Sequence, residues 1–147
     1  LGDWFSQFTQ DFCLTHGLDQ EALALEVAPG LTITFDTNQL HQVVWNIAEN
    51  ALQHCNRAHP FPWISITADY GYPTNQVVIN ITDQGPGVPA DQLEELFTPF
   101  FTERDGGTGL GLYIARELCS ANQANLACTT VAPEGARFTI TVANSSP

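Results

Sequence analysis

Apolar residues recur every three or four positions in three stretches of the chain, which is the spacing of one buried helix face. The first stretch covers residues 1–16 and ends before Gly17, a residue suited to helix termination. The second covers residues 37–55, and Asp36 directly before it is a suitable helix N-cap. The third covers residues 110–122. The sequence therefore predicts three amphipathic helices.

Other stretches alternate apolar and polar residues, as a strand with one buried face does. These stretches cover residues 21–27, 31–35, 63–69, 76–83, 125–131 and 136–142. A turn rich in Gly, Pro and Asn joins the third and fourth strands as a hairpin. Residues 85–107 are rich in turn residues, with one short helix near 90–96. Adjacent strands with short connections favour an α+β fold (an α/β sandwich), with a mixed, largely antiparallel sheet covered on one face by about three helices.

The bulk composition narrows the possible partners. The 147 residues make one domain, and 4 basic against 16 acidic residues give a net charge of −12. Nucleic acid and anionic membranes need a basic face, so neither is expected as a partner. The absence of methionine leads us to expect a piece of a longer protein. The four cysteines lie in apolar stretches without C-x-x-C spacing, so we expect buried free thiols rather than disulfides.

A glycine-rich segment stands directly before the third predicted helix. Four glycines fall between Gly106 and Gly111, and the segment is either a plain flexible turn or a cradle for phosphate. A helix N-terminus attracts anions because it carries unpaired N–H groups and a partial positive charge. The chain has no lysine, which excludes a Walker A loop and a eukaryotic-type protein kinase. Backbone N–H groups, Mg²⁺ and arginine would therefore have to hold any phosphates.

Two further segments are candidates for chemistry. On the second predicted helix, Asn46, Asn50 and His54 share one face, which is either a solvated polar stripe or a set of ligands for Mg²⁺. In residues 81–90, the glycine spacing formally matches a dinucleotide-binding fingerprint, G-x-G-x-x-A. We reject that match because two prolines break the turn into a helix that the fingerprint requires. The alternative there is a plain Pro-Gly loop.

Taken in order, these segments resemble the ATP-binding catalytic domain of bacterial sensor histidine kinases, in the Bergerat-fold ATPase superfamily. The family's N box corresponds to "NIAENA", its first glycine box to Asp83, Gly85 and Gly87, its F box to "LFTPFFTER" and its second glycine box to "GTGLGL". The resemblance covers nearly all of residues 1–143. The stretches "NALQ", "PFFT" and "RELCSANQA" are similar to the type IV pilus and nitrogen-regulation sensor kinases. The resemblance implies the Bergerat fold for the whole chain.

The resemblance also implies roles around the adenine and the metal. Asp83 would accept a hydrogen bond from the adenine amino group, and Gly87 would let the backbone pass under the base. His54 stands where many members have an aromatic residue near the adenosine. Asn50 would be the main Mg²⁺ ligand, with Asn46 beside it as a second metal residue. The implied cofactors are therefore ATP and Mg²⁺.

A third set of implied roles concerns the phosphates. Residues 98–108 would form a mobile ATP lid anchored by Phe100 and Phe101, with Arg104 as a phosphate contact. Gln53 stands where many members have lysine, so one phosphate contact is missing. The implied ATP-binding residues are Asn46, Asn50, Gln53, His54, Asp83, Gly85, Gly87, Val88, Phe100, Phe101, Arg104, Gly107, Thr108, Gly109, Leu110, Gly111 and Leu112.

The reaction implied by the resemblance is transfer of the γ-phosphoryl group of ATP to a histidine on a separate domain. Two alternatives remain open, a serine kinase of the anti-sigma-factor type and a nucleotide-sensing interaction module without transfer activity. Serine kinases and ATP-hydrolysing relatives carry a glutamate four residues before the magnesium asparagine, where this chain has Asn46, which favours the histidine kinase. No histidine here has the family's acceptor setting, H-E/D-x-x-x-P. We therefore expect no acid–base residue in this chain and no activity from the chain alone.

The implied partners follow from the same resemblance. They are the dimerisation and histidine-phosphotransfer domain of the parent protein and a downstream response regulator. The parent would be a homodimeric inner-membrane sensor, and this piece a monomeric cytoplasmic domain without direct membrane contact.

Overall fold

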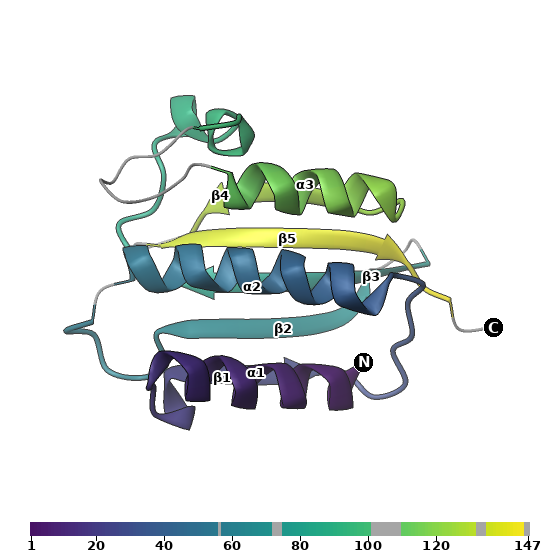
Figure 1. The fold of residues 1–147 in the computed structure, drawn as a ribbon, viewed down its shortest axis with the longest axis horizontal. Coiled ribbons are helices and arrows are strands. Elements are labelled where there is room, and N and C mark those ends of the chain that lie inside the picture. The colour runs from purple at the N-terminus through teal and green to yellow at the C-terminus, as the bar shows by residue number, and fades with distance from the viewer. Residues whose placement is uncertain (56, 72–74, 101–109, 132–134, 146–147) are drawn as a thin grey trace.

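The computed structural model describes residues 1–55, 57–71, 75–100, 110–131 and 135–145, and these contain five strands in a single sheet of order β1–β2–β3–β5–β4 (Figure 1). The strands are β1 (Leu23–Val27), β2 (Ile64–Gly71), β3 (Gln76–Asp83), β4 (Asn125–Thr130) and β5 (Ala136–Ala143). The α-helices are α1 (Gly2–His16), α2 (Thr37–His54) and α3 (Gly111–Ala121). Short 3₁₀ turns are η1 (Gln20–Ala22), η2 (Ala90–Gln92) and η3 (Glu95–Phe97).

The strand pairing combines one parallel pair with three antiparallel pairs. Strand β1 runs parallel to β2, with Leu23 opposite Ile64, and all the other neighbours are antiparallel. The β2–β3 pair is the predicted hairpin, and it sets Asp83 opposite Ile64. Strand β5 lies between β3 and β4, where Arg137 pairs with Thr82 on one side. The predicted α+β fold with a mixed, largely antiparallel sheet is confirmed.

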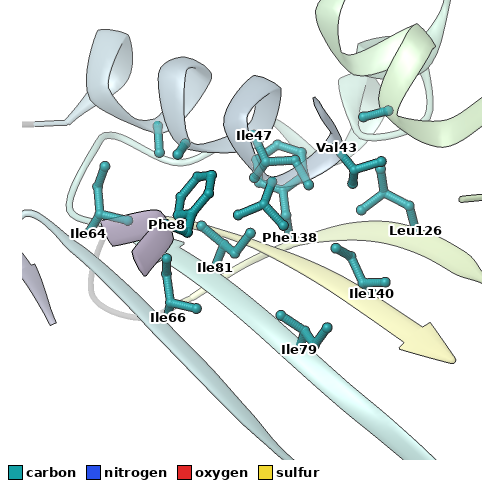
Figure 2. Close-up of a cluster of buried hydrophobic side chains, with 14 of the residues drawn as sticks. Phe8, Val43, Ile47, Ile64, Ile66, Ile79, Ile81, Leu126, Phe138 and Ile140 are labelled. Atoms are coloured by element: carbon teal, nitrogen blue, oxygen red, sulfur yellow. The ribbon is translucent and has the colours of Figure 1, made fainter. Parts of the chain in front are cut away.

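The helices α1, α2 and α3 lie on one face of this sheet (Figure 1). The strands are pleated, so alternate residues point toward the helices, and these are the apolar positions of the sequence pattern. Figure 2 shows how side chains from the helices and from the sheet meet in one cluster. Its labelled residues are Phe8, Val43, Ile47, Ile64, Ile66, Ile79, Ile81, Leu126, Phe138 and Ile140.

The predicted helix boundaries have the expected local chemistry. The Asp36 side chain accepts a hydrogen bond from the Gln39 N–H and thereby caps α2. Gly17 ends α1 in the left-handed conformation, with φ 64°, which glycine adopts at little steric cost. In the described part of the chain, no helix combines the length and the apolar character needed to cross a membrane.

The strand predicted over residues 31–35 is wrong. The structure forms only an isolated antiparallel bridge there, between Ile33 and Asn144. Leu31 is buried, and Ile33 and Phe35 pack partly buried against the core. The apolar alternation therefore reflects one-sided burial of an irregular segment.

The single short helix predicted near residues 90–96 is also wrong. Two separate 3₁₀ turns, η2 and η3, occupy this stretch. Thr98 follows η3 in an extended conformation, with ψ 146°. The residue before a proline is disfavoured in the helical region, so Pro99 ends the turn one residue earlier.

All four cysteines are free and buried, as predicted. Burial raises the pKa of Cys119 and Cys128 to about 12, and it also raises the pKa of Cys13. The thiolate is the reactive form, so these thiols should react very slowly in the folded protein. We expect a disulfide-exchange reagent at pH 8 to label Cys119 and Cys128 at least 100 times more slowly in buffer than in denaturant. Mass spectrometry of labelled peptides measures this, and fast labelling of the folded chain would contradict the burial.

Candidate functional site

A buried carboxylate lies at the end of β3. Asp83 is 3% exposed, and its Oδ1 accepts two backbone hydrogen bonds, from Gly85 N at 2.9 Å and from Ala136 N at 3.1 Å. Both bonds use Oδ1, and among the described residues no hydrogen bond reaches Oδ2. A buried charge needs hydrogen-bond partners. Among the described residues, Oδ2 is therefore open to a further donor.

The electrostatics of Asp83 lead to the same conclusion. Burial raises the pKa of Asp83, while the N–H donors of Gly85 and Ala136 and the nearby His54 act in the opposite direction. The net shift is upward, so the two backbone donors do not replace the lost hydration of the carboxylate. An additional N–H donor at Oδ2 would stabilise the ionised form.

Glycines surround this carboxylate because side chains would not fit. A Cβ on Gly85 would lie 2.3 Å from the backbone oxygen of His54, and a Cβ on Gly135 would lie 2.3 Å from the backbone oxygen of Asp83. Gly87 and Gly135 also have positive φ angles, 79° and 133°, which favour glycine. The loop after β3 is thus pressed against the last residue of α2 and the start of β5. This contact brings His54 close to Asp83.

Gly135 was not predicted as a site residue. It closes the turn before β5 and pairs its oxygen with Val131 N at 3.1 Å. The signal for it in the sequence is the glycine directly before the last alternating stretch, in "PEGARFTITV". That glycine is what lets the start of β5 approach Asp83.

The predicted amide residues of α2 lie in different environments. Asn46 is half-buried, donates from Nδ2 to the Gly111 oxygen at 3.0 Å and accepts from Gln42 Nε2 at 2.6 Å. Asn50, one turn further along the same helix face, is half-buried and makes no side-chain hydrogen bond to the described residues. Gln53 is exposed, and His54 ends the helix.

The first turn of α3 meets α2 at this point. Helix α3 begins at Gly111, and its N-cap residue Leu110 provides no side-chain hydrogen bond. The hydrogen bond from Asn46 to the Gly111 oxygen ties this helix start to α2. Leu112 is buried beneath the same turn. The N-terminus of this eleven-residue helix therefore lies beside the amide residues of α2.

The segment before the glycine-rich stretch is anchored by an aromatic residue. Phe97 is buried and contacts Phe138 edge to face at 6.2 Å between ring centroids. The Arg116 guanidinium lies 4.5 Å from the Phe97 ring centre and 3.3 Å from Glu94, two contacts that were not predicted. The Glu94 side chain of this ion pair is 86% exposed, so the packing of Phe97 is the stronger anchor.

Of the other predicted site residues, the structure describes Val88 and Phe100. Val88 is partly buried against the core, and Phe100 is 72% exposed with a positive φ of 65°. Most of the predicted lid, 98–108, lies outside the described residues. So do these predicted site residues: Phe101, Arg104, Gly107, Thr108 and Gly109.

The arrangement can recognise two chemical groups. The free acceptor on buried Asp83 suits an amino group on a planar ring that enters past the glycines. The start of α3 and the neighbouring amide of Asn50 suit an anion and a hard cation, since amide oxygens are ligands for Mg²⁺. Within the described segments, no group of three or more His, Cys, Asp or Glu residues is placed to hold a metal ion.

Comparisons with known proteins agree with this chemistry. The family described as histidine kinase-, DNA gyrase B- and HSP90-like ATPase matches residues 35–146. The sensor protein kinase PilS of Pseudomonas aeruginosa is 38% identical over 148 residues, which is 98% of this chain and 27% of PilS. The sensor histidine kinase ZraS of Salmonella typhimurium is 34% identical over 137 residues, or 86% of this chain and 29% of ZraS. The chain spans less than a third of the length of these two relatives.

Solved structures show the same fold. The mycobacterial sensor histidine kinase MprB superimposes with a TM-score of 0.72 at 22% identity, covering 95% of this chain and 94% of that one. Full-length ShkA, solved in complex with AMPPNP, gives a TM-score of 0.77 at 24% identity, covering 99% of this chain and 31% of that one. The resemblance seen in the sequence motifs is confirmed. This chain belongs to the histidine kinase-, DNA gyrase B- and HSP90-like ATPase family and is homologous to the catalytic domains of sensor histidine kinases.

Proposed function

We propose that this domain binds Mg-ATP and donates the γ-phosphoryl group to a histidine on a separate phosphotransfer domain of a two-component sensor kinase. The observation that carries the proposal is Asp83, a buried carboxylate whose Oδ1 is used by two backbone donors and whose Oδ2 is left for a ligand. Adenine offers an amino group to that oxygen. Guanine has a carbonyl at the same position, so the site should select ATP over GTP.

The remaining nucleotide contacts are assigned to the residues that surround this carboxylate. Gly85 and Gly87 allow the base close to the backbone, His54 and Val88 flank the adenosine, and Asn50 faces the phosphates. The proposal extends to the predicted phosphate-binding residues Gln53, Phe100, Phe101, Arg104, Gly107, Thr108, Gly109, Leu110, Gly111 and Leu112. The start of α3 supports this side of the assignment.

Magnesium fits the residues present. Asn50 has an amide oxygen without a partner among the described side chains, and we assign it as the main ligand. Asn46 was expected beside it as a second ligand, but both ends of its amide are hydrogen-bonded, to Gly111 and to Gln42, which favours a different role. When bound, the ion would neutralise phosphate charge and orient the phosphates. The chain's own part is to hold the base at Asp83 and the phosphates between α2 and α3.

The described residues favour transfer over hydrolysis. Hydrolysis needs a base that takes a proton from water, and the Asn46 amide cannot do so. The nearby carboxylate of Glu49 lies 3.6 Å from His16 Nε2, so it is directed to α1 and away from Asn50. A histidine acceptor brings its own nucleophilic nitrogen and needs less activation. The relatives are sensor histidine kinases, and neither the serine-kinase nor the non-enzymatic alternative has any support of this kind.

The rest of the proposal concerns the parent protein. Its dimerisation and phosphotransfer domain would supply the acceptor histidine, and a response regulator would receive the phosphoryl group downstream. We place this domain in the cytoplasm beneath an inner-membrane sensor and expect the separate domain to be a monomer. These partners follow from the relatives being two-component sensor kinases.

A trans-labelling experiment tests the reaction. With Mg²⁺ and γ-³²P-ATP, the domain alone should neither label itself nor hydrolyse ATP, whereas a purified phosphotransfer domain from a related sensor kinase should acquire label. The label should be base-stable and acid-labile, as expected for phosphohistidine. His16 and His41 pack on the rings of Phe12, Phe8 and Trp45, so neither is presented to a nucleotide at Asp83.

The controls separate binding from transfer. An acceptor domain with histidine replaced by glutamine should stay unlabelled, and ADP binding should be retained in the same preparation. Label on any histidine of this chain, or rapid phosphate release without the acceptor, would contradict the proposed division of labour.

A further inference from the structure

Both ends of the Asn46 amide are hydrogen-bonded. Nδ2 donates to the backbone oxygen of Gly111 at 3.0 Å, and Oδ1 accepts from Gln42 Nε2 at 2.6 Å. Gly111 is 65 residues away in the sequence and is the first residue of α3. Asn46 therefore joins α2 to α3. The bond forms only when the amide is oriented with its nitrogen toward Gly111.

The chemistry of the partners determines that orientation. A backbone oxygen can only accept, so the Asn46 atom that faces Gly111 must be the nitrogen. The oxygen then faces Gln42, and Gln42 must present its own nitrogen. The two hydrogen bonds that link Gly111, Asn46 and Gln42 can therefore form in only one orientation of the two amides. Gln42, an exposed residue one turn before Asn46, donates to the Asn46 oxygen in that orientation.

A second polar tie joins the same two helices at their other end. Asn122, which caps the C-terminus of α3, donates from Nδ2 to Gln39 Oε1 at 2.7 Å and accepts from the Asp36 N–H at 3.0 Å. The α2–α3 pair is therefore fixed at the start of α3 by Asn46 and at its end by Asn122. Only the first tie lies next to Asn50, which follows Asn46 by one turn on the same face.

We propose that Asn46 is a positioning residue rather than a magnesium ligand, with its amide oriented by the Gly111 oxygen. It holds the N-terminus of α3 at a fixed place relative to Asn50. The expected effect on nucleotide affinity rests on the proposed ATP-binding function. The hydrogen bond between Asn46 and Gly111 does not. A ligand role and a positioning role differ in what an added negative charge does.

Asn46→Asp separates the two roles. A carboxylate is a better magnesium ligand than an amide, so a ligand role predicts retained or tighter binding of Mg-ADP. A positioning role predicts loss, because a carboxylate has no donor for the Gly111 oxygen and the two oxygens repel. We expect ADP affinity to fall about tenfold. The fall should be equal with Mg²⁺ and with EDTA, as measured by calorimetry.

Gln42→Glu provides a variant outside the nucleotide site. A glutamate at this exposed position cannot donate to Asn46 Oδ1, and the Asn46 amide cannot turn without setting its oxygen on the Gly111 oxygen. We expect ADP affinity to fall about threefold, again without dependence on magnesium. Gln42→Ala removes the partner without adding repulsion and should bind ADP as the unchanged protein does. Asn122→Ala cuts the remote tie and should also leave ADP affinity unchanged.

Hydrogen exchange of the nucleotide-free domain tests the tie directly. The Ile114 N–H donates to the Leu110 oxygen at 2.8 Å and closes the first turn of α3. Its exchange should be at least threefold faster in Asn46→Asp and in Gln42→Glu, and unchanged in Asn122→Ala. Should Asn46→Asp fail to fold, Gln42→Glu carries the test.

The outcomes are distinct. Loss of affinity with and without magnesium, together with faster Ile114 exchange, supports the positioning role. Retained affinity for Mg-ADP in Asn46→Asp, or tighter binding, overturns it in favour of a metal ligand. If the wild-type protein binds no ADP, the proposed function fails. Hydrogen exchange of the Ile114 N–H then decides alone whether the hydrogen bond between Asn46 and Gly111 holds the start of α3.

Discussion

Asp83→Asn is expected to lower the affinity for ATP by about 100-fold without destabilising the fold. In the variant, the amide oxygen must face the N–H groups of Gly85 and Ala136, so the amide nitrogen takes the place of Oδ2. Two donors, this nitrogen and the adenine amino group, would then meet in a dry site. Leaving a buried donor without an acceptor costs about 1–3 kcal/mol, and 1.4 kcal/mol is a factor of ten in affinity.

The fold should tolerate this change because of the sign of the Asp83 pKa shift. Burial raises the pKa in the folded state above its usual value. The ionised carboxylate that exists at neutral pH is therefore less favourable in the folded chain than in the unfolded chain. An amide removes this cost and keeps both backbone hydrogen bonds. We expect the thermal unfolding midpoint to be unchanged or higher.

Calorimetry with ATP, GTP and ITP gives the decisive comparison. The wild-type protein should prefer ATP. Asp83→Asn should lose that preference because its amide nitrogen can donate to the ring carbonyl of GTP or ITP. Asp69→Asn makes the same change at an exposed position of β2 and should bind ATP normally. Equal affinity of the unchanged protein for ATP and GTP would remove Asp83 from the base-recognition role.

The parts of the fold that could be predicted were those that depend on residues close together in the sequence. Amphipathic spacing, Asp36 and Gly17 define α1 and α2, because a helix face and its caps involve residues close in sequence. The strand predicted over residues 31–35 was wrong because the prediction used only this local pattern. An irregular segment with one buried side has the same alternation as a strand, and only its long-range pairing, here the isolated bridge from Ile33 to Asn144, distinguishes them.

The candidate site shows the same division. Asp83 and the glycines after it were predictable from a short motif, since the carboxylate and one of its donors, Gly85 N, lie within three residues of each other. Gly135 was not, because its role comes from the approach of β5 to Asp83 across the sheet. The hydrogen bond from Asn46 to Gly111 likewise joins residues whose proximity depends on helix packing. No local pattern records such a contact.

Gly85→Ala is expected to destabilise the domain by about 3 kcal/mol and to lower the unfolding midpoint by about 10 °C. The added Cβ would lie 2.3 Å from the backbone oxygen of His54 and 3.1 Å from Asp83 Oδ1. The first of these neighbours is main chain at the end of α2, so no side-chain rotation relieves it. The loop after β3 must move, which breaks the bond from Gly85 N to Asp83. ATP affinity should therefore fall at least tenfold, a loss measured by calorimetry alongside thermal unfolding.

Gly111→Ala is the matched control, because it makes the same chemical change at a second glycine of the predicted site. Its Cβ would lie 3.8 Å from the nearest atoms of Asn46, which is ordinary contact, and alanine is favoured over glycine in a helix by about 1 kcal/mol. The unfolding midpoint should stay unchanged or rise. The two substitutions thus separate a glycine required by close backbone contact from one that the fold itself does not require. If Gly85→Ala were as stable as Gly111→Ala, the loop after β3 could not be pressed against α2, and the placement of Asp83 beside His54 would have to be abandoned.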